Sequence, residues 1–378
     1  MIDQHFHSAR SALKVAVLGT GALATEVSRI IRDTVDDLSE RAGTRLVLDA
    51  VSGADLLVDT TDTAASSTTV LAALRAGGSV LTANTALIAE YGHRLAAAAE
   101  EYGADLCFEA AVAGGVPVVR PLTQSLSGDR VRQVLGVFPI DGANPVAQAA
   151  ILATLAFHTR VEVADVHFEE FGAADPHDLA AAEALSLRLR PLTVCTRVSE
   201  QPGPEHGGKE QISVRVHPAL LPATHPLARV DAPAVTVEAD SAGQLMFSGR
   251  DTPRATASAL LGDLVTAARN RVNGGRAPRA SYYAELPVAP LGDTPTRYYL
   301  NLHVTDHAGA LAQVASIFAD HGVSIERVRQ EHHNDAAHLI VLTHRARESA
   351  LTDTVDALTD ASCVRAVRTR WRVEGADD

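Results

Sequence analysis

The feature that most constrains the fold is a glycine-containing turn between a predicted strand and a predicted helix. Residues 13–18 (LKVAVL) form a short apolar run typical of a buried strand, and residues 19–24 (GTGALA) follow at once. Apolar residues then recur at helical spacing up to Leu38. Strand, glycine turn and amphipathic helix in this order are the beginning of a βαβ unit.

Strands and helices continue to alternate as far as residue 130. Predicted strands lie at 45–51, 55–61, 79–84 and 105–112, with helices near 64–76 and 86–102. Alternation of this kind is typical of a parallel, doubly wound sheet. The sequence therefore predicts an α/β protein whose N-terminal Rossmann domain covers 13–130.

Two further domains are predicted after residue 130. The middle region, 131–271, reads as an α+β dimerisation and substrate domain with strands at 131–137, 192–198, 211–216, 234–239 and 244–249 and helices at 145–157, 177–190 and 255–270. A linker rich in Gly, Pro and Arg spans about 272–295. Strands at 297–304, 323–330, 337–344 and 364–373, with helices at 309–321 and 347–359, give 297–374 the ferredoxin-like βαββαβ order.

Composition excludes several classes of partner. Lys and Arg total 33 against 46 Asp and Glu, for a formal net charge of −13. Nucleic acids and anionic membranes demand clustered basic residues, so neither is an expected partner. The 3 cysteines are far apart in sequence, which fits a reducing cytoplasm better than a disulfide framework. No apolar run reaches the roughly 20 residues that a membrane span needs.

The glycine turn is a candidate dinucleotide site. Glycines allow a tight turn and close backbone approach, and the N-terminus of the following helix offers free amides to a pyrophosphate. A purely structural βα turn would show the same residues. Rossmann sites usually place an acid for ribose, or a basic residue for a 2′-phosphate, at the end of the second strand. Asp49 is the only nearby acid, so NAD and NADP both remain open.

Four segments give the chain a family resemblance over nearly its whole length. They are TANTALIAEYG (82–92), FEAAVAGGVPVVR (108–120), VHPALLPATHPLA (216–228) and TASAL (256–260). In this order they resemble the homoserine dehydrogenase family. The resemblance implies NAD(P)-dependent interconversion of homoserine and aspartate semialdehyde, in threonine and methionine biosynthesis in the cytoplasm. It also implies a C-terminal ACT module and a homodimer or homotetramer.

The resemblance assigns two groups of binding residues. The cofactor-binding positions are Gly19, Thr20, Gly21, Ala22, Leu23 and Asn84. The position at which the family holds a structural sodium ion corresponds to Glu109 with the backbone carbonyls of Val112, Gly114 and Val116. Oxygen ligands suit such a hard cation, although a tight glycine-rich packing turn would read the same way.

The catalytic positions depart from the family pattern. Thr85 stands where the family has a lysine near substrate and nicotinamide, and Gln148 stands where it has a second lysine that moves the proton. Asn144 occupies an acidic position, which leaves Asp141 as the nearest acid to bind substrate or take part in catalysis. A substrate loop and the acidic segment after it are missing beyond residue 137. Neither Thr nor Gln titrates near neutral pH.

Three more residues complete the predicted site. Arg120 could hold a substrate carboxylate through its planar guanidinium, or could be an ordinary surface arginine. Asp141 could equally be an exposed residue of an Asp-Gly turn. His158 reads as a residue at a helix end rather than as a catalytic base.

The C-terminal module resembles an ACT domain through the D-x-x-G-x-L turn of Asp306, Gly309 and Leu311. The resemblance implies that an amino-acid effector binds there, although a module that only dimerises would carry the same turn. Three functions follow from the whole sequence. The first is a dehydrogenase of the homoserine type acting on a small amino-acid substrate. The second is a catalytically silent paralogue that regulates a partner, and the third is a dehydrogenase with an altered substrate.

Overall fold

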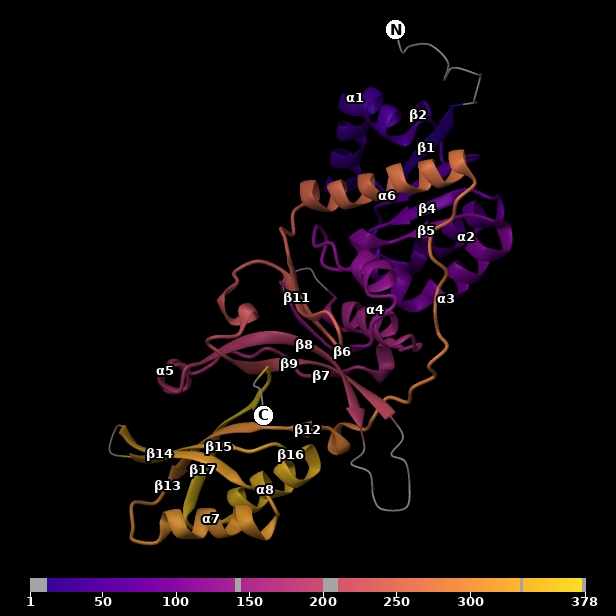
Figure 1. The fold of residues 1–378 in the computed structure, drawn as a ribbon. Coiled ribbons are helices and arrows are strands. Elements are labelled where there is room, and N and C mark those ends of the chain that lie inside the picture. The colour runs from indigo at the N-terminus through magenta and orange to yellow at the C-terminus, as the bar shows by residue number, and fades with distance from the viewer. Residues whose placement is uncertain (1–11, 140–143, 200–209, 334–335, 376–378) are drawn as a thin grey trace. The chain divides into compact units, whose positions relative to one another are not determined.

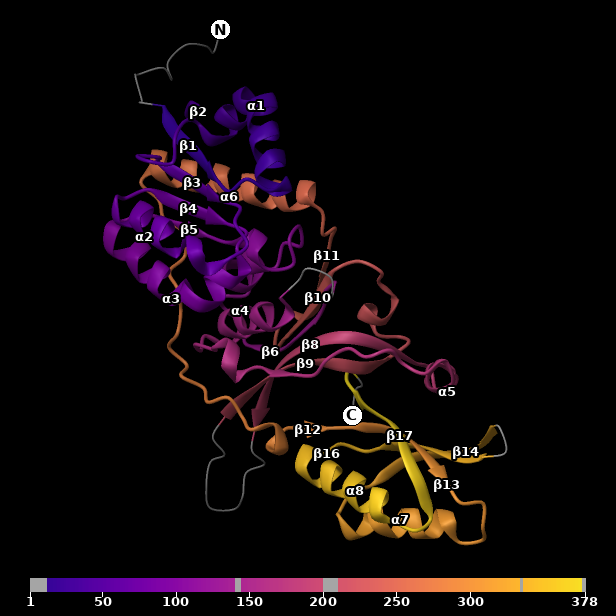
Figure 2. The same cartoon turned by 180° about the vertical axis from the view of Figure 1, so that it is seen from behind.

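The computed structural model describes residues 12–139, 144–199, 210–333 and 336–375, and the chain divides into two compact units (Figures 1 and 2). The first unit contains the chain up to residue 134, 138–164 and 232–285. The second contains 135–137, 165–231 and the chain from 286 onward. Within the described residues, no helix is both long enough and apolar enough to cross a membrane.

A five-stranded sheet forms the centre of the first unit, and every pairing in it is parallel. The strand order β2-β1-β3-β4-β5 confirms the predicted doubly wound sheet. The strands are β1 (Leu13–Leu18), β2 (Leu46–Leu48), β3 (Leu56–Asp59), β4 (Ser79–Thr82) and β5 (Leu106–Cys107). The helices that connect them are α1 (Ala22–Ala42), α2 (Ser67–Arg75) and α3 (Thr85–Tyr102).

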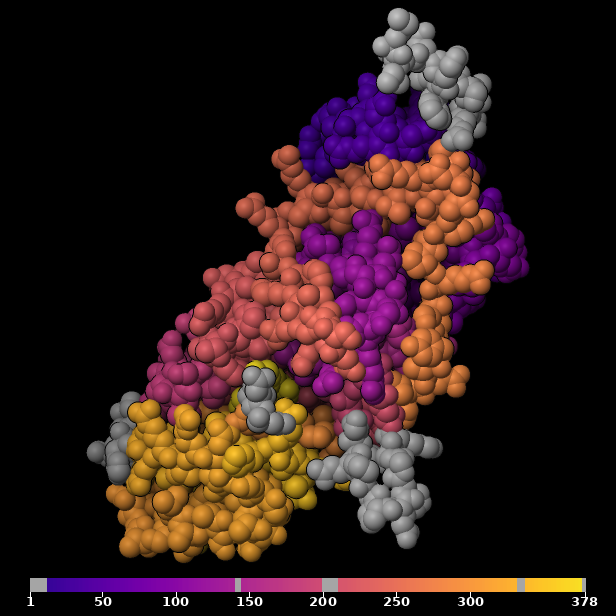
Figure 3. Space-filling model, in the orientation of Figure 1, coloured from indigo at the N-terminus to yellow at the C-terminus, as the bar shows by residue number. Residues whose placement is uncertain are grey.

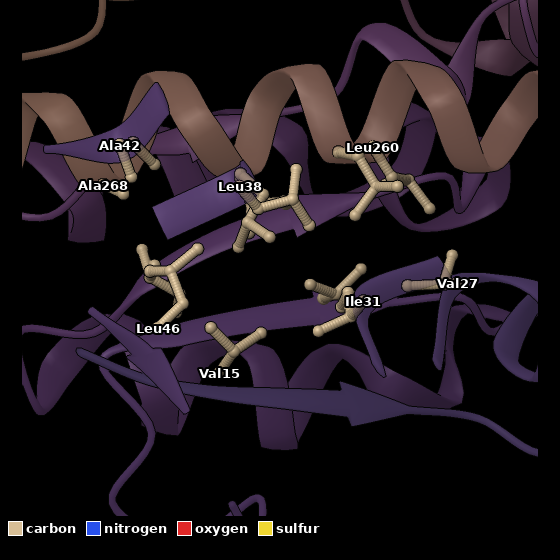
Figure 4. Packing of buried hydrophobic residues seen from close by; sticks show 14 of the residues in the cluster. Val15, Val27, Ile31, Leu38, Ala42, Leu46, Leu260 and Ala268 are labelled. Carbon is tan, nitrogen blue, oxygen red and sulfur yellow. The ribbon is translucent and has the colours of Figure 1, made fainter. Parts of the chain in front are cut away.

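Apolar side chains cover both faces of this sheet because successive strand residues point in opposite directions. Val15 of β1 packs with α1 on one face, and Ala16 packs with α2 and α3 on the other. The first face has a further partner, α6 (Pro253–Asn273), which supplies Leu260 and Ala268 to the same cluster (Figure 4).

The position of α6 differs from the predicted domain boundaries. The sequence places residues 255–270 in the middle domain, whereas α6 belongs to the first unit and lies along α1. An amphipathic pattern predicts that a helix buries one face, but it does not specify which sheet receives that face.

The remaining elements of the first unit begin and end within one residue of their predicted bounds, but they too were predicted to lie in the middle domain. They are β6 (Val131–Val137), which runs across the boundary between the units, α4 (Pro145–Phe157), β10 (Ala234–Ala239) and β11 (Gly243–Ser248). Asn144 caps α4, since its Oδ1 accepts a hydrogen bond of 3.0 Å from the amide of Ala147. His158 ends the helix in a left-handed conformation, with φ at 52°, as expected for a residue at a helix end.

The first elements of the second unit are β7 (His167–Phe168), α5 (Pro176–Ala184), β8 (Leu187–Ser199) and β9 (Glu210–Pro222). β8 and β9 form a long antiparallel hairpin. The predicted helix over 177–190 is wrong at its end, because α5 stops at Ala184 and residues 187–190 belong to β8. Their sequence, LRLR, alternates with the period of two that favours a strand.

The C-terminal part of the second unit confirms the βαββαβ order. Its elements are β12 (Pro295–Thr296), β13 (Tyr298–Val304), α7 (Ala310–Asp320), β14 (Ile325–His333), β15 (Ala336–Thr343), β16 (Ala346–Arg347), α8 (Glu348–Asp360) and β17 (Val364–Val373). The four main strands lie in the order β17-β13-β15-β14. β17 also pairs in parallel with β9, so this sheet continues into the hairpin.

Candidate active site

The glycine turn directly follows β1, and Gly19 is required there for two reasons. Its φ is +120°, which L side chains rarely adopt, and a Cβ atom would lie 2.4 Å from Oγ1 of Thr60. The Thr60 hydroxyl is fixed in this place because it donates a hydrogen bond of 2.8 Å to the carbonyl of Leu18. Gly19 therefore lets the ends of β1 and β3 approach closely.

Gly21 opens the other side of the turn toward space that is free of protein atoms. Gly21 is the N-cap of α1 and has no side chain that could form a capping hydrogen bond. A Cβ atom built on it would meet nothing within 4 Å. The first amides of a helix have no partner inside it, so those of Ala22, Leu23 and Ala24 lie beside this open space. Thr20 and Gly21 are exposed. These residues fit the pyrophosphate of a dinucleotide, which binds helix N-termini through such amides.

β2 is too short to bring Asp49 to this turn. Its last residue, Leu48, lies opposite Val15, and the Asp49 amide bonds to the Val15 carbonyl at 2.8 Å. Gly19 is four residues further along the chain, a distance of about 13 Å at strand spacing. The Asp49 carboxylate instead forms a salt bridge of 3.0 Å with Lys14. The structure thus gives Asp49 no position from which to bind the ribose of a nucleotide at the turn.

Asn84 lies in a buried polar network where β3 and β4 end. Its Oδ1 accepts a hydrogen bond from the amide of Leu87 and caps α3, while its Nδ2 donates to Oγ1 of Thr61 at 2.9 Å. Asp59 accepts hydrogen bonds from the hydroxyls of Thr61 and Thr82 at 2.6 and 2.8 Å. Both polar atoms of the Asn84 side chain are therefore used within the protein, and its role toward a cofactor stays a prediction.

Beyond β5, the partly exposed Arg120 forms a cluster with the buried carboxylates of Glu109 and Asp263. The carboxylate of Glu109 accepts hydrogen bonds from the amides of Val119 and Arg120, at 2.8 and 2.9 Å. The Arg120 guanidinium lies 3.7 Å from the same carboxylate and donates to Oδ1 of Asp263 on α6. Oδ2 of Asp263 accepts the Glu109 amide at 3.1 Å. One guanidinium thus faces two carboxylates.

Burial controls the protonation of this cluster. It raises the pKa of the Asp263 carboxyl to about 6, because the attraction of Arg120 only partly offsets the loss of solvent. Burial also raises the pKa of Glu109, although two backbone amides favour its ionised form. When both acids are ionised, the cluster has one more negative than positive charge.

The cluster forms part of the wall of a large cavity. The cavity has a volume of about 1030 Å³ and is lined by α3, the residues after β5, α4, α6 and residues 276–282. Figure 3 shows the segment after α6, in orange, along the purple and magenta surface of the N-terminal elements. The cavity brings together Glu109 and Arg120, two of the predicted site residues. The glycine turn, Thr85 and Gln148 are not among the described residues that line it.

Comparisons with known proteins match almost the whole chain. Three family models match: "Homoserine dehydrogenase, NAD binding domain" over 31–109, "Homoserine dehydrogenase" over 138–265, and "ACT domain" over 298–362. Homoserine dehydrogenase of Mycobacterium tuberculosis is 41% identical over 434 aligned positions, covering 96% of this chain and 97% of the relative. The chain belongs to the homoserine dehydrogenase family. It is therefore an NAD(P)-dependent oxidoreductase with a C-terminal ACT domain.

A further relative and a solved structure are also similar to this chain. Homoserine dehydrogenase of Corynebacterium glutamicum is 38% identical, with 96% of each chain covered. The crystal structure of a homoserine dehydrogenase from Thiobacillus denitrificans has the same fold, with a TM-score of 0.86, 24% identity and coverage of 96% of this chain and 98% of that one. The alignment to the Mycobacterium protein is longer than the 378 residues of this chain. The relatives therefore have segments that this chain lacks.

The three predicted catalytic positions differ in what the structure shows. The Thr85 hydroxyl donates a hydrogen bond of 2.7 Å to the carbonyl of Ala111, so it links α3 to the segment after β5. Gln148 on α4 is buried, and its Oε1 has no hydrogen-bond partner among the described residues. Asp141, also predicted to bind substrate, lies outside the described residues. The catalytic roles of these three residues stay predictions.

The role of Glu109 as a sodium ligand stays a prediction. Both carboxylate oxygens accept main-chain N–H groups, and a guanidinium lies beside them. Within the described residues, no group of three or more His, Cys, Asp or Glu side chains is placed to hold a metal ion. The carbonyls of Val112, Gly114 and Val116 also remain predicted ligands.

The predicted effector residues of the ACT domain lie at the start of α7. Gly309 is the N-cap of this helix with φ at +95°, and a Cβ atom there would meet nothing within 4 Å. Leu311 is 46% exposed and Asp306 is also exposed. This helix N-terminus is open in the single chain, as an effector site would require.

Sequence reasoning missed Asp263, although a signal was present. Asp263 lies on the same face of α6 as the buried residues Leu260, Leu264 and Ala267. A carboxylate on the apolar face of a helix needs a buried partner, because an isolated buried charge is very unfavourable. That position could have been matched with Arg120, the predicted substrate-binding residue that follows the FEAAV segment.

Proposed function

We propose that the chain is an NAD(P)-dependent dehydrogenase that acts on the alcohol or aldehyde group of an amino-acid derivative, and that homoserine is a poor substrate for it. The observation that supports cofactor use is the geometry of the Gly19–Gly21 turn. There the backbone leaves open space beside the first amides of α1 at the end of β1. This is the place where doubly wound sheets bind dinucleotides.

The Gly19–Gly21 turn would hold a nicotinamide dinucleotide, which would supply the hydride acceptor for oxidation of the alcohol carbon. The hydroxyl proton must leave as the carbon–oxygen double bond forms, and a positioned base contributes typically 10²–10⁴-fold to such a step. The Thr85 hydroxyl is committed to Ala111, and Gln148 does not titrate near neutral pH. We assign the proton to Glu109 and Asp263, because both carboxyls lie in the cavity wall after β5 and burial raises the pKa of each.

A second function is supported by the same substitutions. Without ionisable side chains at positions 85 and 148, the chain could bind nucleotide and amino acid without turnover and act on a partner through its ACT domain. Both proposed functions require nucleotide binding. They differ in whether hydride is transferred between nucleotide and substrate.

Nucleotide binding is tested with a matched pair of glycine variants. Gly21→Ala places a methyl group where the pyrophosphate would lie, and Gly128→Ala places one in equally open space in a turn far along the chain. We expect NADH or NADPH fluorescence titration to show binding by the wild type and by Gly128→Ala. Gly21→Ala should bind roughly tenfold more weakly, through loss of close amide contacts. Absence of binding by both nucleotides to the wild type would refute both functions.

Turnover then separates the dehydrogenase from the regulatory protein. Homoserine and other amino alcohols are incubated with NAD⁺ or NADP⁺ at alkaline pH, where loss of the hydroxyl proton is favoured. Reduced nucleotide formed from any of them supports the dehydrogenase. Tight nucleotide binding with no hydride transfer to or from any of them supports the regulatory reading.

We also propose an amino-acid effector at the Gly309 turn and a homodimer or homotetramer in solution. The exposed N-terminus of α7 and the ACT family match support the effector. Thermal shift with L-threonine and related amino acids is the test, with Gly309→Val as the variant that should abolish the shift. Light scattering of the full chain measures the oligomeric state, and a monomer would contradict the proposal.

A further inference from the structure

We propose that Arg254, at the start of α6, contacts the pyrophosphate of the bound dinucleotide and supplies a positive charge that the glycine turn itself lacks. The inference rests on the proposed dinucleotide site at the Gly19–Gly21 turn. It adds to that site a cofactor-binding residue from a distant part of the chain.

The loops at the carboxyl edge of the parallel sheet contain no basic residue. A dinucleotide brings a negative charge on each phosphate of its pyrophosphate, and the amides at the start of α1 offer only partial positive charges. Asp62 and Glu109 lie in these loops and add to the negative charge. Lys and Arg are absent from the stretches that follow the strands, which are 19–24, 49–55, 60–66, 83–86 and 108–119. A counter-charge for the pyrophosphate is therefore expected from another element.

The helix α6 begins at the same edge of the sheet as α1. In the cluster that both helices share, Val27 lies with Leu260 at one end, and Ala42 lies with Ala268 at the other (Figure 4). Residue numbers rise in the same direction along both helices, so α6 runs parallel to α1. Because α1 begins directly after the glycine turn, the first residues of α6 lie on the side of the sheet where that turn is.

The register of the two helices places Arg254 beside Glu26. Near the C-terminal ends, Nε of Arg269 donates a hydrogen bond to the carbonyl of Arg41. Arg254 and Glu26 each precede their member of this pair by the same number of residues. The pKa of the Glu26 carboxyl is lowered, chiefly by hydrogen bonds from Arg29 and further by the charge of Arg254. Arg254 therefore lies beside the second turn of α1, about one turn from the amides that would bind the pyrophosphate.

Two glycines after β5 allow the start of α6 to lie at this edge. A Cβ atom on Gly115 would lie 2.7 Å from the Cβ atom of Ala255, in the first turn of α6. A Cβ atom on Gly114 would lie 2.7 Å from Oδ1 of Asp251, so this carboxylate faces the backbone of Gly114. The loop before α6 therefore packs closely against the segment that follows β5. This packing holds the backbone of Arg254, which precedes Ala255, at the sheet edge.

The guanidinium of Arg254 is available to a ligand. Arg254 is exposed, and among the described residues its side chain forms no hydrogen bond or salt bridge. It is the second residue of α6 after the N-cap Thr252, where a positive charge is unfavourable because of the helix dipole. Arginine binds phosphate groups through parallel N–H donors. A bound pyrophosphate would therefore use a charge that does not stabilise the helix.

The test compares two neutral variants by fluorescence titration with NADH and with NADPH. Arg254→Gln removes the proposed charge. Arg32→Gln is the matched control, because Arg32 is also exposed and lies about 16 Å further along α1 than Gly21 at helical rise. Each titration uses the full chain at low and at high ionic strength. The unfolding temperature establishes that each variant is folded.

At low ionic strength, we expect Arg254→Gln to bind NADH and NADPH roughly tenfold more weakly than the wild type, through loss of a charged hydrogen bond. Both nucleotides should be affected equally, since they share the pyrophosphate. At high ionic strength the difference should shrink to within about threefold, because salt screens an exposed charge. Arg32→Gln should bind both nucleotides like the wild type. The unfolding temperature of Arg254→Gln should not fall, because a positive charge is removed from a helix N-terminus.

Arg254→Lys separates the charge from the shape of the side chain. It keeps the positive charge, so it should bind NADH within about threefold of the wild type at low ionic strength. Binding as weak as that of Arg254→Gln would contradict a contact through charge.

Three further results would overturn the inference: equal affinity of the wild type and Arg254→Gln for NADH, a loss confined to NADPH, or a loss that salt does not change. A loss confined to NADPH would place Arg254 at the 2′-phosphate instead of the pyrophosphate. In each of these results the wild type binds nucleotide. They are therefore distinct from failure of the proposed function, in which the wild type binds neither nucleotide and both proposals are wrong.

Discussion

Asp263 shows how one buried side chain connects the nucleotide-binding sheet with the cavity. It extends from α6 to the Arg120 guanidinium and to the amide of Glu109, which follows β5. Removing solvent disfavours its charged form, and the resulting pKa of about 6 lies above the usual range of an aspartate carboxyl. The native protein therefore takes up a proton at a pH where the unfolded chain does not.

This shift predicts a pH dependence of stability. A raised carboxyl pKa gives a stability contribution that is complete below the unfolded pKa and is lost as pH rises through the folded one. From pH 4 to 6, the free energy of unfolding of the wild type should fall relative to that of Asp263→Asn by about 1–3 kcal/mol. Urea unfolding at pH 4, 5, 6 and 7 measures it. Parallel pH profiles for the two proteins would contradict the prediction.

Restoring lysines tests the two catalytic substitutions. In Thr85→Lys/Gln148→Lys we expect homoserine oxidation to rise by roughly 10- to 100-fold, because an ionisable group returns to the reaction. Thr85→Met/Gln148→Met is the matched control of similar length without charge. Initial rates of NAD(P)H formation are compared. Equal rates in the lysine and methionine variants would mean that homoserine oxidation is limited by the absence of the segment that the relatives have and this chain lacks.

At the residue scale, the sequence predicted contacts that depend on neighbours in the chain better than those that depend on distant ones. Gly19 was assigned correctly to a tight turn because the motif is local. Glu109 and Arg120 were both selected, but as a metal ligand and a substrate ligand. Their hydrogen bonds to Asp263 depend on α6, more than a hundred residues away.

At the element scale, β2 is the strand whose length most affects function. The sequence predicts 45–51, but the strand ends at Leu48, and β3 starts opposite the same residue of β1, Val15. The chain therefore crosses directly from one side of β1 to the other. Residue pattern alone could not fix this end, because it is set by the register with β1.

The short β2 predicts weak discrimination between nucleotides. With Asp49 paired to Lys14 and about 13 Å from the turn, no carboxylate from this strand reaches the ribose 2′ position. NADH and NADPH should bind with dissociation constants within about fivefold of each other, less than a single favourable charge contact would give. Asp49→Ala should leave their ratio unchanged. A strong NADH preference that disappears in Asp49→Ala would show that this acid does contact the ribose.

At the scale of the whole molecule, the first unit is assembled from three separate stretches of chain. α6 returns to the N-terminal sheet and contributes the fully buried residues Leu260 and Leu264 to its core. The helix itself was predicted from sequence, as was each βα unit before it. The sheet against which the helix packs was not predicted, because the spacing of apolar residues carries no information about long-range packing.

Truncation of a core leucine on α6 measures how much the N-terminal sheet depends on this helix. Leu264→Ala should lower the free energy of unfolding by about 2–5 kcal/mol, through lost burial and the cavity left behind. Leu179→Ala, at a position that is 39% exposed on α5, should lower it by less than about 1 kcal/mol. Both are measured by urea unfolding. Equal losses would mean that α6 is dispensable to the core.

The return of α6 also has a consequence for the order in which the protein can fold as it is made. Domains generally fold as units during synthesis, the N-terminal one first. Here the strands and helices up to residue 112 emerge from the ribosome long before Leu260 and Ala268. Until then, the face of the sheet around Val15 and Leu46 lacks its second helix. The nascent nucleotide-binding sheet therefore exposes apolar surface while more than a hundred further residues are translated, and it is a natural client for chaperones during that interval.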